Sequence, residues 1–271
     1  MFAPRPRLPR FFPLGLLLVL PVSAHSATPA EEDPWQLMAA LRQSESAEAF
    51  AALDTPSETD RLGQALSLLG AQPKTEANLA RAERMLAELA AHASDPAVAV
   101  RAAFLHARVP HIHRQPTDWT EAARRYLAVY RAHPDQPLGQ RALVRHGIVT
   151  LFRPLPPEDF ATTFQSFVTL AADLTDPEAR RDLDWLLLSV HERRLDDPAS
   201  TLVHLERVLA NPTPLRELTR ISLLVQAGEL ARELGDHAKA ARYYREFLDT
   251  ARRDARVYFI RQRLAEVEAA S

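Results

Sequence analysis

The chain has 271 residues, of which 46% are hydrophobic, and a formal net charge of −2, which excludes a disordered segment and a strongly basic nucleic-acid-binding protein. Alanine (45) and leucine (40) far outnumber valine and isoleucine (19 together), and seven glycines are too few for an all-β chain or for the phosphate loops of a nucleotide-binding α/β fold. The composition therefore indicates a globular, mainly helical protein.

Residues 1–24 have the three parts of a secretory signal peptide. Arg5, Arg7 and Arg10 form a basic start. An apolar run at 11–20 and a small-residue cleavage site at 22–24 follow it. An uncleaved membrane anchor is the alternative. The apolar run is interrupted by Pro13 and has about half of the roughly 20 apolar residues that a membrane-spanning helix needs. The sequence therefore predicts export.

Removing this segment leaves 30 basic and 35 acidic residues and no cysteine for disulfides, lipidation or thiolate metal sites. No later segment is apolar enough to span a membrane. We therefore expect a periplasmic or secreted product with no cofactor, no nucleic-acid partner and no membrane span. Residues 25–33 read as a flexible lead-in, and 34–271 as one helical-repeat domain.

Apolar residues recur at intervals of three and four along the rest of the chain, as in Leu62, Leu66 and Leu69, which gives each helix one buried stripe. No segment has a convincing strand pattern. The predicted helices are 34–43, 46–53, 56–70, 76–93, 96–109, 119–133, 138–152, 157–174, 177–194, 198–210, 214–233, 237–252 and 254–269.

Many of these helices begin with a capping side chain followed by proline, whose missing N–H costs nothing at the first helical position. The six dipeptides of this kind start at Asp33, Thr55, Asp95, Asp176, Asp197 and Thr213. Thr55 with Glu58 and Asp118 with Glu121 also have the spacing of a capping box.

Short connections between the helices predict antiparallel neighbours stacked as hairpins. Prolines 96, 134, 177 and 212 are separated by 38, 43 and 35 residues, which is close to the size of a two-helix repeat unit. The irregular period indicates degenerate repeats.

Three histidines, His106, His111 and His113, cluster around Pro110, and the last two could present their imidazoles to one metal ion. No HExxH helix is present, and the nearest carboxylate, Asp118, follows five residues after His113. We therefore interpret them as surface histidines in a turn between helices, and we predict no metal site.

Acid pairs such as Asp182 with Asp184, or Asp196 with Asp197, allow a general acid/base interpretation. A helix cap at Asp197 and a solvated charged face around Asp182 explain them more simply. No nucleophile elbow, P-loop or dinucleotide fingerprint is present. The aromatic residues at helical spacing, among them Tyr126 and Tyr244, are interpreted as core rather than as a ligand platform.

The stretch from Leu223 to Leu248 resembles a tetratricopeptide repeat. Its matching positions are Leu224, Ala227, Gly228 and Ala231 on the first helix, the turn Gly235-Asp236, and Ala240, Tyr244 and Phe247 on the second helix. Small residues at 228 and 240 would let two helix axes approach closely. A weaker match covers Trp119 to Pro134, with Pro110 at the position of the family's glycine, and an ordinary helical bundle remains the alternative.

The resemblance implies a TPR-like α-solenoid whose first helices line a groove for an extended peptide or a partner's helix. The groove-facing positions it implies are Ser222, Val225, Gln226, Glu229 and Arg232. Family members that grip a C-terminal carboxylate use lysine and asparagine at two of these positions. Since this chain has Val225 and Glu229 there, that type of clamp is not expected.

The leading hypothesis is an exported, non-catalytic adaptor or assembly factor of the cell envelope that binds a protein or peptide. An envelope enzyme with a helical scaffold, metal-dependent or acting on peptidoglycan, is the second hypothesis, although no separate catalytic domain is evident. A self-assembling structural solenoid is the third.

Overall fold

The computed structural model describes residues 32–270, and every regular element in this part of the chain is helical. The thirteen α-helices there pack against their neighbours in sequence order, so the predicted all-α, solenoid-like stack is confirmed. The predicted signal peptide, 1–24, and most of the lead-in lie outside the described residues. None of the helices within 32–270 is both long and apolar enough to cross a membrane.

The helices begin and end within a few residues of the predicted positions. They are α1 (Pro34–Ala39), α2 (Gln43–Ala51), α3 (Glu58–Gly70), α4 (Glu76–His92), α5 (Pro96–Arg108), α6 (Trp119–Ala132), α7 (Pro137–Phe152), α8 (Pro157–Ala171), α9 (Pro177–Val190), α10 (Pro198–Ala210), α11 (Glu217–Glu233), α12 (His237–Thr250) and α13 (Val257–Ala269). Two short π-helical turns, η1 (Val109–His113) and η2 (His191–Leu195), continue α5 and α9.

Four of the six predicted caps are present, because a carboxylate at each of these positions accepts a backbone N–H of the first helical turn. The four are Asp33, Asp95, Asp176 and Asp197. Asp118 likewise accepts the N–H of Glu121, at 2.9 Å. The Glu121 carboxylate does not reach back, because it binds Arg124 and Arg125, which lower its pKa to about 2.

The other two predicted caps, at Thr55 and Thr213, are wrong. The capping box before α3 is formed by Ser57 and Asp60 rather than by Thr55 and Glu58, because the helix begins two residues later than expected. The segment after Thr213 is not helical until Glu217, and the side chain of Asn211 holds the N–H of Thr213 in a turn at 2.9 Å.

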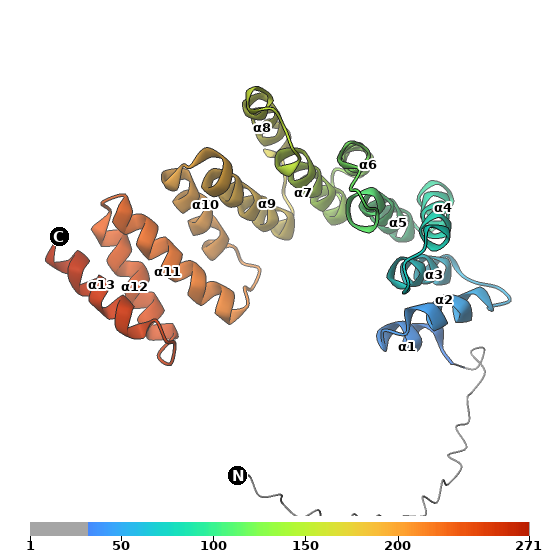
Figure 1. Cartoon of the computed structure of the whole chain (residues 1–271), viewed down its shortest axis with the longest axis horizontal. Helices are drawn as coiled ribbons and strands as arrows, with labels where there is room; N and C mark the ends of the chain where they lie inside the picture. The colour runs from blue at the N-terminus through green and yellow to red at the C-terminus, as the bar shows by residue number, and fades with distance from the viewer. Residues whose placement is uncertain (1–31, 271) are drawn as a thin grey trace, which may run out of the picture.

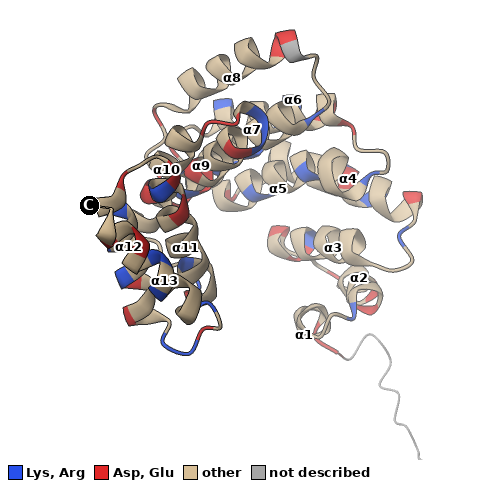
Figure 2. Cartoon of the chain, turned by 60° about the vertical axis from the view of Figure 1, so that its left-hand side comes forward, with Lys and Arg blue, Asp and Glu red and all other residues tan. Residues whose placement is uncertain are grey.

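The helices follow one another along an arch from α1 to α13 (Figure 1). The odd-numbered helices α3, α5, α7 and α9 also contact each other directly, α3 with α5, α5 with α7 and α7 with α9. α8 differs from the other internal helices of the stack, because it packs mainly against one neighbour, α7. It stands on the outer side of the arch, as both views show (Figure 1; Figure 2). Charged residues of both signs are distributed over the helices, whereas α8 is charged only at its first turn (Figure 2).

The core is divided into four clusters that follow the stack, and each joins a few neighbouring helices. This arrangement is typical of solenoids, whose repeats contact only their neighbours. The predicted core aromatics Tyr126, Tyr243, Tyr244 and Phe247 are buried in it. α13 closes the last cluster through Ile260 and Val267, as expected of a capping helix.

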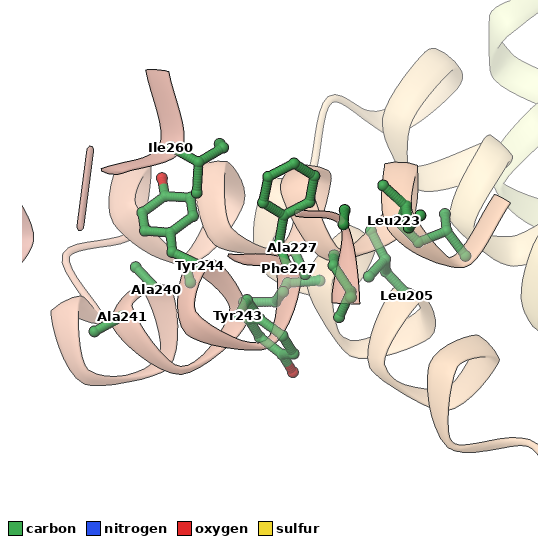
Figure 3. Packing of buried hydrophobic residues seen from close by; sticks show 14 of the residues in the cluster. Leu205, Leu223, Ala227, Ala240, Ala241, Tyr243, Tyr244, Phe247 and Ile260 are labelled. Carbon is green, nitrogen blue, oxygen red and sulfur yellow. The ribbon is translucent and has the colours of Figure 1, made fainter. Parts of the chain in front are cut away.

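Gly228 allows the close packing of α11 on α12, although its neighbour differs from the predicted one. A Cβ at Gly228 would lie 2.4 Å from the ring of Tyr244, so the ring of Tyr244, rather than the methyl group of Ala240, occupies the space beside this glycine. The Tyr244 ring lies between Ala240 and Ile260 (Figure 3), and its hydroxyl donates to Glu229 at 2.6 Å. The ring is therefore fixed on all sides.

Candidate functional site

The five residues that the resemblance places on a groove lie on α11 and differ in their freedom to bind a ligand. Val225 packs against the C-terminal core cluster, and Ser222 is exposed. Gln226 donates to Glu192 of η2 at 3.3 Å. Glu229 accepts hydrogen bonds from Tyr244 and from Arg232, at 2.6 and 2.9 Å. These contacts tie α11 to its neighbours.

The electrostatics of Glu229 match this structural role. Burial alone would raise the pKa of its carboxyl, but the hydrogen bonds from Tyr244 and Arg232 outweigh burial and lower the pKa. Arg263 of α13 approaches to 3.7 Å and adds a second positive charge. Glu229 is therefore an ionised carboxylate of α11 that links this helix to α12 and α13.

A groove of about 390 Å³ lies where α7 and α9 contact each other directly. Its lining residues follow one face of each helix at intervals of one, three and four, as helical geometry requires. They are Val144, Arg145, Ile148 and Phe152 from α7, and Asp182, Trp185, Leu186, Ser189 and Arg193 from α9 and η2.

The groove is separate from α8. None of its lining residues comes from α8, although α8 packs against α7. α8 stands on the outer side of the arch (Figure 1), whereas the groove is lined only by residues of α7, α9 and η2. Trp185 also packs against the core cluster that α9, α10, α11, α12 and α13 build together, and Val225 packs against the same cluster.

Several polar groups of this groove lack a partner in the described part of the chain. No carboxylate there lies within 4.0 Å of the guanidinium group of Arg145 or Arg193. The indole N–H of Trp185 and the hydroxyl of Ser189 donate no hydrogen bond to the described residues. Asp182, the one lining carboxylate, lies 3.6 Å from Arg181. The groove therefore presents more free donors than acceptors.

Two larger clefts contain side chains that are mostly engaged within the protein. In the cleft of about 870 Å³ beside η1, Lys74 contacts His113 at 3.4 Å and Arg114 binds Glu76 at 2.7 Å. In the cleft of about 670 Å³ between α8, α9 and α10, Asp184 binds His204 at 3.1 Å. The groove between α7 and α9 differs from them in having two arginines, Arg145 and Arg193, that both lack a carboxylate partner within the described residues.

The three clustered histidines contact three different partners. His106 faces Glu83 at 3.9 Å, His111 faces the hydroxyl of Tyr126 at 3.3 Å, and His113 faces Lys74. Burial lowers the pKa of all three, so they favour the neutral form. Within residues 32–270, no group of three or more histidine or acidic side chains is arranged to hold a metal ion.

The acid pairs lie in structural contacts. Asp197 caps α10 and lies 3.4 Å from His191, whereas Asp184 pairs with His204. The rings of His191 and His204 stack at 5.4 Å and join η2 to α10. No sequence pattern indicates that these histidines pair, because 13 residues separate them and only the hairpin brings them together.

Sequence reasoning also missed the residues of the groove, including Arg145, Ile148, Trp185 and Arg193. Their helical spacing was the only signal available, and it is shared by every amphipathic helix in the chain. No protein-family model matches the chain, and no curated protein matches its sequence.

Proposed function

We propose that the chain is an exported, non-catalytic helical-repeat protein that binds a polypeptide. The groove between α7 and α9 carries this proposal, because half-buried apolar side chains and unpaired donors face the same space. Extended peptides offer both apolar side chains and backbone carbonyl acceptors, and binding grooves commonly combine an apolar floor with a few polar groups.

The tetratricopeptide-like pattern at 223–248 and the solenoid-like stack support the same function, since stacked hairpins create extended surfaces for recognition. The basic start and apolar run of residues 1–20 support export. We accordingly propose that the partner is met in the periplasm or outside the cell.

A display library of random peptides, selected on the purified protein, tests this function. We expect enrichment of peptides whose capture is lost in a Ser189→Trp variant, because the indole would fill the groove without removing a core side chain. Ser166→Trp is the matched control, since Ser166 is exposed on α8, on the outer side of the arch.

The control variant should capture the peptides as well as the unmodified protein does, and both variants should keep the helical circular dichroism of the parent. A selection that enriches no peptide, or peptides that the Ser189→Trp variant captures unchanged, would refute the proposed function.

A further inference from the structure

The apolar floor of the groove fits side chains rather than a flat surface. Ile148, Phe152 and Trp185 are only partly buried, while Val144 and Leu186 lie beneath them. A volume of about 390 Å³ is at the lower end of the range for ligand sites. The space therefore suits one or two apolar side chains of a bound segment.

Each wall of this groove carries one arginine side chain. Arg145 belongs to α7, and Arg193 follows α9 in η2. The only lining carboxylate, Asp182, already faces Arg181 at 3.6 Å. Because guanidinium groups form their strongest hydrogen bonds with carboxylates, the chemical group that complements these walls is an acidic side chain.

The remaining free donors select for the same kind of ligand. The indole N–H of Trp185 and the hydroxyl of Ser189 can both donate to a carboxylate or a backbone carbonyl. A long polyanion is disfavoured, because the chain as a whole has a net charge of −2 and its acids are distributed over the arch (Figure 2). A short acidic segment matches both the local and the overall charge.

Resting on the proposed function, we infer that the groove between α7 and α9 recognises a peptide segment in which apolar side chains are flanked by acidic residues. The apolar side chains contact Ile148, Phe152 and Trp185. The flanking carboxylates pair with Arg145 and Arg193. The site thus selects its partner by a combination of shape and charge.

Fluorescence anisotropy with three labelled Gly/Ser-rich peptides tests this inference. Their cores are Glu-Leu-Phe-Glu, Gln-Leu-Phe-Gln and Glu-Ala-Ala-Glu. We expect the first to bind about tenfold more tightly than either of the others, which corresponds to one charge-assisted hydrogen bond or one apolar contact. Added salt should reduce the preference for glutamate over glutamine, because it screens exposed charges.

A double variant, Arg145→Gln with Arg193→Gln, should bind the Glu and Gln peptides equally. Arg180→Gln is the matched control, because Arg180 lies exposed on α9 and lines the cleft beside α8 instead. This control should keep the full preference for the acidic peptide.

The two proposals fail in different ways. If peptides bind in a Ser189-dependent manner but the Glu and Gln cores bind equally, the charge selection is refuted and the peptide-binding function stands. If no peptide binds at all, both are refuted. A dimer of this chain that Ser189→Trp dissociates would make a second copy the occupant and would likewise overturn the inference.

Discussion

Replacing Gly228 by leucine should open the C-terminal hairpin, at a cost of about 3 kcal/mol or more, because a side chain there collides with a ring that cannot move. Even a Cβ would lie 2.4 Å from the Tyr244 ring, which is fully buried and hydrogen-bonded to Glu229. Hydrogen exchange should report the loss locally, in α11 and α12, since repeats of a solenoid depend mainly on their neighbours.

Gly70→Ala is the control for this substitution. A Cβ at Gly70 would meet only the flexible side chain of Gln43, at 3.1 Å, so we expect little change in protection. A double variant, Gly228→Leu with Tyr244→Leu, should cost less than the sum of the two single changes. Additive free-energy costs of the two substitutions, or unchanged exchange in α11 and α12, would contradict the packing of Gly228 against the Tyr244 ring.

Glu83→Gln should destabilise the N-terminal half of the arch by about 2 to 3 kcal/mol, because it leaves two partly buried guanidinium groups without their shared carboxylate. Glu83 of α4 is 18% exposed and binds both Arg114, which follows η1, and Arg125 of α6, each at 2.6 Å. Urea unfolding, followed by helical circular dichroism, measures the loss. Glu88→Gln on the same helix is the control, since its exposed pair with Arg61 should contribute less than about 1 kcal/mol.

The contribution of Glu83 should also depend on pH. Burial would raise its pKa, but the hydrogen bonds from Arg114 and Arg125 prevail and hold the folded-state pKa below the ordinary value of 4.5. A carboxyl with a depressed pKa stabilises the fold fully above the unfolded-state pKa, and this stabilisation is lost as the pH falls through the folded-state value. The difference in free energy of unfolding between the parent and Glu83→Gln should therefore become smaller below about pH 4.5. A difference in free energy of unfolding that stays constant at acidic pH would contradict the role of the ion pairs of Glu83 with Arg114 and Arg125.

The helices and most caps could be predicted because they depend on residues close together in the sequence. Asp95, Asp176 and Asp197 act within their own first turns, and apolar spacing of three and four identifies each stripe. The two π-helical turns escaped prediction, since periodicity does not distinguish a widened last turn from a regular helix. The outward position of α8 also escaped, because it depends on the direct contact between α7 and α9.

The candidate site was less predictable because its properties depend on distant pairs. Gln226 is hydrogen-bonded to Glu192. Glu229 contacts Tyr244 and Arg263, and these three pairs are separated by 15 to 34 residues in the sequence. Conversely, Arg145 and Arg193 resemble any other arginine on a helix until the fold shows that, within the described residues, no carboxylate lies within 4.0 Å of either one. Sequence periodicity identifies the buried face of a helix, but it does not identify which exposed face lines a groove.

Hydrogen–deuterium exchange with and without a library-selected peptide shows whether a peptide occupies the groove between α7 and α9, because it locates binding helix by helix. The peptide should slow exchange in α7 and α9, which form the groove, and leave exchange in α4 and α12 unchanged. Slowed exchange confined to α8 or to other helices on the outer side of the arch would contradict binding in this groove.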